Sequence, residues 1–393
     1  MAVSSVSPSL LDSRERDADG CVERGDIKKA TQILVEIVQL DAGRIETWLK
    51  IAALRRAAGN LQGAIAAATD ALRSDPLHLV ALLSRARLIE ASGDVKEAGR
   101  AYTLALSQVP EGDAVQATLI PLINHARTAS ANYQNNVAAI WDSSINSFDG
   151  LSEAVRRRLE RFKSNALRRT RVYHSEPSHY HYPGLIEREF HDRDLFPWLR
   201  EFETATTAIQ HELSRLIEKG QAAKEPYIQY SADTPVRQWA SLNHSLDWTA
   251  FHLLKGGQRV SQNADQCPET MLAIAKINQP QMKGRSPNAM FSLLKPQTRI
   301  PPHTGISNTR LVCHLPLIVP DNCWFRVGAQ RREWRIGEAF VFDDTIEHEA
   351  ANDSDYPRVV LIIDIWHPGL DSMERRAIER VMEADEDHNG APL

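Results

Sequence analysis

The chain has 393 residues, a net charge of −5, 42% apolar residues and 25% charged residues. These values predict a soluble protein of roughly two or three domains. They exclude a global basic field for nucleic acid or an anionic membrane. Four scattered cysteines without a CxxC pair argue against a disulfide framework or zinc ribbon, and favour a reducing compartment. Without a signal-peptide pattern or an apolar run of about 18 residues, we expect a cytoplasmic protein with no membrane insertion.

A 34-residue repeat occupies the first third of the chain. The dipeptides Gly25-Asp26, Gly59-Asn60 and Gly93-Asp94 follow each other at this step, as do Ala30, Ala64 and Ala98. Small residues allow two antiparallel helices to approach closely, and the glycine suits the turn between them. The pattern resembles tetratricopeptide repeats, which stack into a helical solenoid. Either a concave surface for a peptide or protein partner, or a structural spacer, is compatible with this pattern.

The domain limits follow from shifts in this pattern. We expect a flexible tail over residues 1–15, tetratricopeptide-like repeats over 16–112, and a helical cap and connector over 113–167, with helices near 114–129, 133–145 and 151–166. A second domain is expected over 168–370, and a helix with a frayed tail over 371–393. Residues 196–219 read as one amphipathic helix. The fold class is therefore α+β and multidomain.

Chemistry-bearing residues gather in a β-rich stretch, 291–368. Runs of β-branched and aromatic residues alternate there with turn residues, which predicts a barrel or jelly roll. His303 follows two prolines, and His348 lies 45 residues later, after an apolar strand. Arg358 follows His348 by ten residues and opens the last strand. Two histidines and a distant arginine in this order are typical of iron(II)- and 2-oxoglutarate-dependent oxygenases, where arginine pairs with the cosubstrate's distal carboxylate.

The same stretch resembles the aspartyl/asparaginyl β-hydroxylase family, some of whose members also carry tetratricopeptide repeats. The matching segments are FSLLKPQTRIPPHTG, SNTRLVCHLPLIVP, CWFRVG, WxxGEAFVFDDTIEHEAAN and RVVLIIDIWHP. The resemblance implies a double-stranded β-helix (jelly roll) and a reaction that uses Fe(II), 2-oxoglutarate and O2. The product would be an aspartyl or asparaginyl residue hydroxylated at its β-carbon, in a peptide, a protein or a small molecule, with succinate and CO2 as coproducts.

The resemblance also implies roles for seven residues. The iron ligands would be His303 and His348; Ser292 and Arg358 would bind the distal carboxylate of 2-oxoglutarate; His314 would lie near its metal-bound end; Arg310 and Asp344 would face the substrate. The residues alone leave alternatives, such as core histidines, a surface ion pair for Arg358 with Asp353 or Asp355, and turn acids at Asp343 and Asp344.

Two positions depart from the wider pattern. Two residues after the first histidine, where the wider superfamily commonly has an acid, this chain has Gly305. The resemblance implies that water takes the place of that acid on the metal. Two residues before His314, many relatives have an arginine where this chain has Val312. This replacement changes how the metal-bound end of 2-oxoglutarate, or an acidic substrate, is held. The alternatives to peptide hydroxylation are hydroxylation of a lipid acyl chain, a non-catalytic repeat scaffold with a degenerate barrel, and a cupin-like metal protein with other chemistry.

Overall fold

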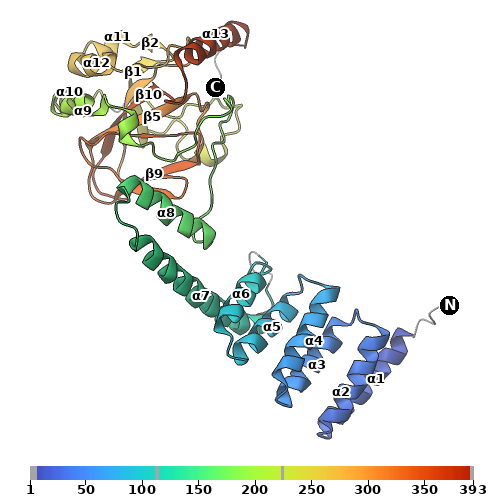
Figure 1. Ribbon diagram of the computed structural model, residues 1–393. Helices are drawn as coiled ribbons and strands as arrows, with labels where there is room; N and C mark the ends of the chain where they lie inside the picture. The colour runs from blue at the N-terminus through green and yellow to red at the C-terminus, as the bar shows by residue number, and fades with distance from the viewer. Residues whose placement is uncertain (1–6, 111–114, 223–224, 390–393) are drawn as a thin grey trace. The chain divides into compact units, whose positions relative to one another are not determined.

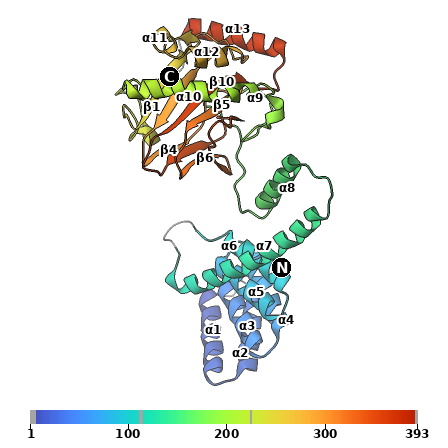
Figure 2. The same ribbon diagram turned by 90° about the vertical axis from the view of Figure 1, so that its left-hand side faces the viewer.

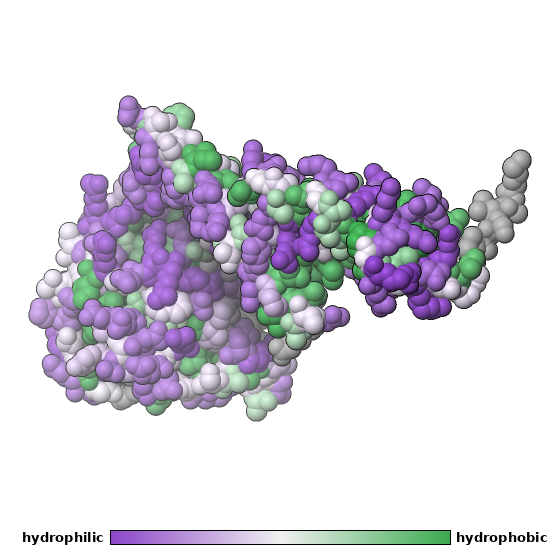
Figure 3. Space-filling view, turned by 90° about the horizontal axis from the view of Figure 1, so that it is seen from below, coloured by the Kyte–Doolittle hydropathy of each residue, from purple (hydrophilic) through white to green (hydrophobic). Residues whose placement is uncertain are grey.

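The computed structural model describes residues 7–110, 115–222 and 225–389, and it divides into two compact units (Figure 1). The first unit ends at Leu167 and the second begins at Arg168. None of the helices within the described ranges combines the length and the apolarity that crossing a bilayer requires. On the face drawn in Figure 3, hydrophilic residues predominate and hydrophobic residues form patches between them.

Three antiparallel helix pairs open the first unit. They are α1 (Pro8–Glu23) with α2 (Ile27–Leu40), α3 (Ile45–Ala57) with α4 (Leu61–Ser74), and α5 (Leu79–Ala91) with α6 (Val95–Leu106). The second helices of the three pairs, α2, α4 and α6, start 34 residues apart. The unit is therefore the tetratricopeptide-like solenoid that the repeat predicts.

The repeated dipeptide explains these starts. Gly25, Gly59 and Gly93 have φ between 77° and 89°, a left-handed conformation that glycine adopts without steric cost. The next residue caps the following helix: the Asp26 carboxylate, for example, accepts a hydrogen bond from the backbone N–H of Lys29. Asn60 and Asp94 cap their helices in the same way. One local turn is therefore repeated three times.

The predicted tail is too long. Helix α1 already begins at Pro8, and Leu11 is buried in the core of the first helix pairs. The part of the predicted tail at residues 1–6 lies outside the described residues. Proline fits the first turn of a helix because that turn leaves its backbone N–H groups unpaired, so Pro8 begins the helix.

The connector holds one long helix where two shorter ones are expected. A 3-10 turn, η1 (Ala117–Leu119), leads into α7 (Ile120–Asn146), and α8 (Glu153–Ala166) follows. The expected break between residues 129 and 133 is absent, because the sequence there contains neither proline nor glycine and the helix continues. The expected start at residue 114 lies outside the described residues.

Two antiparallel sheets form the second unit. The larger has the order β2-β1-β3-β10-β5-β8 and the smaller the order β4-β9-β6-β7. The strands are β1 (Trp248–Lys255), β2 (Gln258–Arg259), β3 (Ala289–Leu294), β4 (Thr298–His303), β5 (Arg310–Ile318), β6 (Cys323–Val327), β7 (Gln330–Glu333), β8 (Phe340–Phe342), β9 (His348–Asn352) and β10 (Arg358–Trp366). From β3 to β10 the chain passes repeatedly between the two sheets, as a jelly roll requires.

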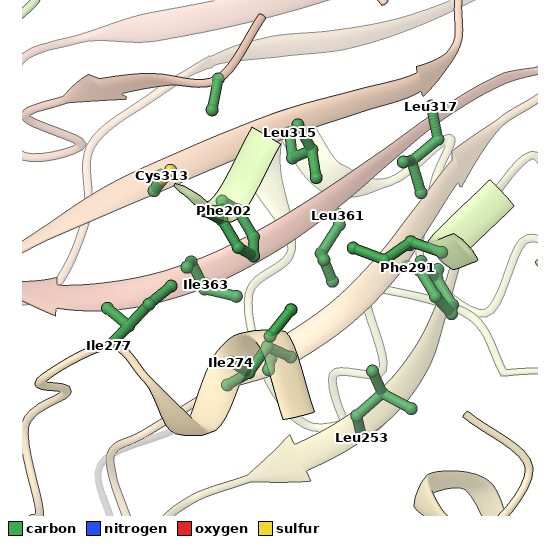
Figure 4. Close-up of a cluster of buried hydrophobic side chains, with 14 of the residues drawn as sticks. Phe202, Leu253, Ile274, Ile277, Phe291, Cys313, Leu315, Leu317, Leu361 and Ile363 are labelled. Carbon is green, nitrogen blue, oxygen red and sulfur yellow. The ribbon is translucent and has the colours of Figure 1, made fainter. Parts of the chain in front are cut away.

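Helices cover the outer face of the larger sheet (Figure 2). They are α9 (Leu199–Thr204), α10 (Thr206–Glu218), α11 (Ser261–Ala264) and α12 (Pro268–Ala275). In the chain, the 3-10 turns η2 (Arg193–Leu195) and η3 (Arg237–Trp239) come before α9 and after α10, and α13 (Ser372–Asn389), the last helix, packs separately against Met282, Trp366 and Leu370. In Figure 4, Leu361 and Ile363 of β10 lie close to Phe202 and Ile274 of the covering helices. This apolar layer fixes one face of the sheet and leaves the other to face the smaller sheet.

The single helix expected over 196–219 is divided at Ala205 into α9 and α10. The hydroxyl of Thr204 donates to the carbonyl of Glu201, and that of Thr206 donates to the carbonyl of Glu203, both at 2.6 Å. Such bonds compete with the regular helical ladder, so the periodicity continues while the helix is interrupted.

Candidate active site

The two predicted metal ligands meet where the smaller sheet pairs β4 with β9. His303 ends β4, His348 begins β9, and the two residues are register partners in the ladder. Their ring centroids are 4.0 Å apart. Residues that are 45 positions apart in the chain therefore present two imidazoles at one place.

Hydrogen bonds to the backbone orient both rings. The Nδ1–H of His303 donates to the carbonyl of Pro301 at 2.8 Å, and that of His348 donates to the carbonyl of Ile346 at 3.1 Å. A carbonyl only accepts, so in each neutral ring Nδ1 carries the proton and Nε2 keeps its lone pair. This is the tautomer that a metal ligand bonded through Nε2 requires.

Both imidazoles are held in the neutral form. Burial, aided by the neighbouring His348, lowers the pKa of His303 to about 3. Burial likewise lowers the pKa of His348 to about 4. At neutral pH the two nitrogen lone pairs are available without removal of a proton, which suits metal binding.

Arg358 opens β10 and is 2% exposed. Its Nη1 donates to the Ser292 carbonyl at a long 3.4 Å, while its Nε has no hydrogen-bond partner within the described part of the chain. The guanidinium lies 4.7 Å from the ring centroid of Trp334, and burial lowers the pKa of Arg358 to about 10. The alternative of a surface ion pair with Asp353 or Asp355 does not hold: Arg358 is buried and, among the described residues, forms an ion pair with neither acid, while Asp353 pairs with Arg299.

Ser292 and His314 flank this guanidinium. The Ser292 hydroxyl accepts a hydrogen bond from the indole of Trp248 at 3.0 Å, so its own hydrogen remains free to donate. The indole N–H of Trp334 donates to Nδ1 of His314 at 3.4 Å. Burial lowers the pKa of His314 well below its usual value, so the ring is neutral and its proton is on Nε2.

Arg310 lies between two carboxylates. Its Nη1 is 3.1 Å from Asp344 and 3.5 Å from Asp364. Burial disfavours its charge, but the two acids outweigh burial and raise the pKa of Arg310 above its usual value. Asp364 is fixed in turn by hydrogen bonds from Ser286 and from the backbone and side chain of Asn288. The arginine is therefore already neutralised by protein groups.

The space beside Gly305 is filled from another segment. A Cβ added at this glycine would overlap the carboxylate of Asp344, and the Gly305 N–H donates to the Asp344 carbonyl at 2.6 Å. The Asp344 carboxylate thus occupies the space beside Gly305, although it reaches there from a loop. Among the described residues, no group of three His, Cys, Asp or Glu side chains is arranged to hold a metal without another ligand.

One cavity of about 330 Å³ unites the site. All seven predicted residues line it, namely Ser292, His303, Arg310, His314, Asp344, His348 and Arg358, and so does Val312. Its size suits a small ligand together with part of a substrate.

Aromatic side chains that the sequence did not predict for the site form another wall of this cavity. Tyr227 stacks on Trp248 with ring centroids 3.8 Å apart, Trp239 lies 6.1 Å from Trp248, and Trp239 is 4.9 Å from the His303 ring. Trp334 and Asp364 are further cavity residues that the sequence did not assign to the site. The motif-like WxxG around Trp334 is the one signal that could have indicated that residue.

Comparison with known proteins finds similarity to hydroxylases over the second unit. A sequence model of the family described as aspartyl/asparaginyl beta-hydroxylase matches residues 203–368. An ornithine lipid ester-linked acyl 2-hydroxylase from Rhizobium tropici is 35% identical over 190 residues, covering 48% of this chain and 63% of that protein. The human aspartyl/asparaginyl beta-hydroxylase is 33% identical over 143 residues, covering 36% of this chain and 19% of that protein.

The chain thus spans less than two thirds of either relative's length. Among solved structures, the Yersinia enterocolitica secretion chaperone SycD in complex with a translocator peptide is 18% identical, with a TM-score of 0.30, and covers 33% of this chain and 96% of that protein.

Proposed function

We propose that this chain, whose residues 203–368 match the aspartyl/asparaginyl β-hydroxylase family, is a member of that family and an iron(II)- and 2-oxoglutarate-dependent dioxygenase. It would hydroxylate the β-carbon of an aspartyl or asparaginyl residue in a peptide, protein or small molecule, and would release succinate and CO2. The observation that carries the proposal is one cavity lined by two neutral, backbone-oriented imidazoles and by a buried guanidinium without a carboxylate partner among the described residues.

The donor set fits the implied metal. His303 and His348 would hold Fe(II) through their Nε2 atoms, because their Nδ1–H groups are engaged by backbone carbonyls. Imidazoles with open positions beside them suit a non-haem iron centre. When bound, the iron would supply the activation of O2 needed to oxidise an unactivated C–H bond. Asp344, beside Gly305, would orient a water at the position left without a protein ligand.

The cosubstrate would bind by charge and hydrogen bonding. Arg358 would form a charge-assisted pair with the distal carboxylate of 2-oxoglutarate, and the Ser292 hydroxyl would donate to the same group. The Nε2–H of His314 would donate to the metal-bound end, where Val312 offers no charge. Burial strengthens each of these interactions because water does not screen them.

A second candidate is hydroxylation of a lipid acyl chain. The aromatic wall of Tyr227, Trp239 and Trp248 favours an apolar group near His303, and Arg310 is already neutralised by two acids. The similarity to an ornithine lipid acyl 2-hydroxylase points to the same class. Peptide binding by the repeats, once measured, would favour the first candidate, since solenoids of this type present concave surfaces.

The decisive experiment measures succinate formation with Fe(II), 2-oxoglutarate and two substrate panels, aspartyl or asparaginyl peptides and acylated lipids. We expect His348→Ala to abolish turnover and metal-dependent 2-oxoglutarate binding. His174→Ala, which changes a histidine whose side chain is 68% exposed, is the matched control and should behave like the wild type. Equal activity of the two variants would overturn the assignment. Absence of metal uptake by the wild type would favour a non-catalytic scaffold.

Location and partners are part of the same proposal. The four free cysteines are all buried, which is compatible with a reducing cytoplasm. The solenoid would bind a peptide or protein, and neither part of the protein would need nucleic acid. The intact chain would be cross-linked to an immobilised substrate peptide, with and without an excess of a second peptide that binds only the repeats. A loss of cross-linking in the presence of the second peptide would show that the repeats recruit the substrate.

A further inference from the structure

The end of α7 and the whole of α8 form a helical hairpin with almost no core of its own. The first part of α7 packs on the solenoid through buried Ile123, Ala126 and Ser130. From residue 139 to residue 146 no side chain of α7 is buried. In α8 the only buried residue is Lys163. Figure 1 draws α7 as one long helix that continues to α8.

Large apolar side chains are nevertheless present on this hairpin. Ile140, Phe148 and Phe162 are 65%, 64% and 61% exposed, and Phe162 stacks on Trp141 with ring centroids 5.5 Å apart. Apolar side chains that are exposed together on one short element mark a candidate interaction surface. We call these four residues the apolar edge of the hairpin.

Basic residues border the apolar edge. Helix α8 carries five basic side chains, at 156, 157, 158, 161 and 163, against two acidic ones, at 153 and 160, a net +3 in a chain whose total charge is −5. Arg158 and Phe162 are both exposed and are four residues apart, so they project from the same side of the helix. The charge thus accompanies the apolar edge.

An ion-pair anchor holds the hairpin together. Lys163 pairs with Asp142 of α7 and with Glu160, the latter at 2.6 Å, and the Arg156 guanidinium donates to the Asn146 side chain at 3.3 Å. These contacts fix α8 on α7, so the apolar edge is a property of the folded hairpin.

We propose that the apolar edge of the α7–α8 hairpin docks peripherally on an anionic phospholipid surface. Phe148, Phe162 and Ile140 would enter the interface, while Arg157 and Arg158 would contact lipid phosphates. Aromatic and aliphatic groups flanked by arginines are the composition of helices that lie in a membrane interface. Each arginine near such a surface adds attraction to anionic lipid. This inference does not depend on the nature of the hydroxylated substrate.

A nucleic acid would also attract the arginines, but it would not account for three exposed apolar side chains beside them. A membrane interface accepts both kinds of group at once. The absence of a bilayer-crossing helix from the described part of the chain makes the expected association peripheral and reversible.

Co-sedimentation of the full chain with vesicles tests the proposal. The vesicles contain phosphatidylcholine, with or without phosphatidylglycerol. We expect binding only to the anionic vesicles, weakened by added salt because screening reduces the attraction of the arginines. The double variant Arg157→Ser/Arg158→Ser should bind roughly 30-fold more weakly, since each basic residue contributes roughly fivefold. Phe148→Ser/Phe162→Ser should lose binding even at low salt.

Matched controls come from the solenoid. Val95→Ser removes an apolar side chain that is 67% exposed on α6, and Arg56→Ser removes an exposed arginine from the last turn of α3. Both should bind vesicles like the wild type. The proposal is overturned if the wild-type protein does not bind anionic vesicles. It is also overturned if the hairpin variants and the control variants weaken vesicle binding equally. Binding to RNA in place of vesicles, or a lower unfolding temperature in Phe148→Ser/Phe162→Ser with unchanged vesicle binding, would also overturn it.

Discussion

Replacing Arg358 with methionine should stabilise the folded protein while abolishing its affinity for 2-oxoglutarate. Burial lowers the pKa of Arg358 from 12.5 to about 10. A pKa change of this size corresponds to about 3 kcal/mol against the charged form in the folded state. The cost is present at neutral pH, where the guanidinium is charged in both the folded and the unfolded chain. Methionine has a similar length and carries no charge, so it removes this cost.

Lost contacts offset part of the gain. The guanidinium lies 4.7 Å from the Trp334 ring centroid, and a buried cation–π contact contributes about 1–2 kcal/mol. The hydrogen bond to the Ser292 carbonyl is 3.4 Å long and contributes little. The net expectation is a free energy of unfolding higher by about 1–2 kcal/mol, or a midpoint of thermal unfolding higher by about 2–8 °C for a unit of this size.

Calorimetry of the wild type, Arg358→Met and Arg299→Met, with and without 2-oxoglutarate and a divalent metal, measures both effects. Arg299 is the control because its side chain is 69% exposed and pairs with Asp353 on the surface. The cosubstrate should raise the midpoint of the wild type and of Arg299→Met, but not that of Arg358→Met. If Arg358→Met unfolds at a lower temperature than Arg299→Met, the buried charge is not a cost. If 2-oxoglutarate still stabilises it, Arg358 does not bind the cosubstrate.

Three further substitutions test other parts of the structure. Burial raises the pKa of Asp343 to about 7, so the folded state keeps a proton that the unfolded chain releases near pH 4. Unfolding free energy should therefore fall as pH rises from about 4 to about 7, and Asp343→Asn should reduce this fall; equal slopes in urea titrations would contradict it. Gly305→Ala would push its Cβ into the Asp344 carboxylate, so succinate formation should fall while 2-oxoglutarate still raises the unfolding midpoint. The Cβ of Gly99→Ala in α6 would overlap Tyr133 of α7, so thermal unfolding should show the solenoid destabilised by about 1–3 kcal/mol. An unchanged unfolding midpoint would show that α6 and α7 can move apart at no cost.

The solenoid was predictable because its physics is local. A left-handed glycine followed by a capping side chain fixes each turn within four residues, so the signal is repeated wherever the turn is. The extent of α7 was harder, because nothing in residues 129–133 either stops or requires a helix. The break at Ala205 depends on threonine hydroxyls that also fit a continuous helix, so periodicity alone does not reveal it.

The active-site region divides in the same way. His303, His348 and Arg358 stand at strand ends in recognisable spacing, and the structure lines one cavity with all three. Tyr227 and Trp239 precede β1 and lie outside the strands, and only the folded chain brings them to the cavity. Their contribution comes from tertiary contacts, which a sequence alone does not encode in any local signal.

The charges around the cavity narrow the choice of substrate. Arg310 is paired with Asp344 and Asp364, and Glu349 pairs outside this group with Arg326. Among the described residues that line the cavity, Arg358 remains as a cation without a carboxylate partner, and Val312 adds no charge. One dicarboxylic cosubstrate would use that cation, because a buried carboxylate needs a partner. The described side chains leave no further unpaired cation for an acid at the reacting position, and Fe(II) would already be shared with the cosubstrate, so a neutral asparaginyl side chain or an acyl chain should fit there better than an aspartate.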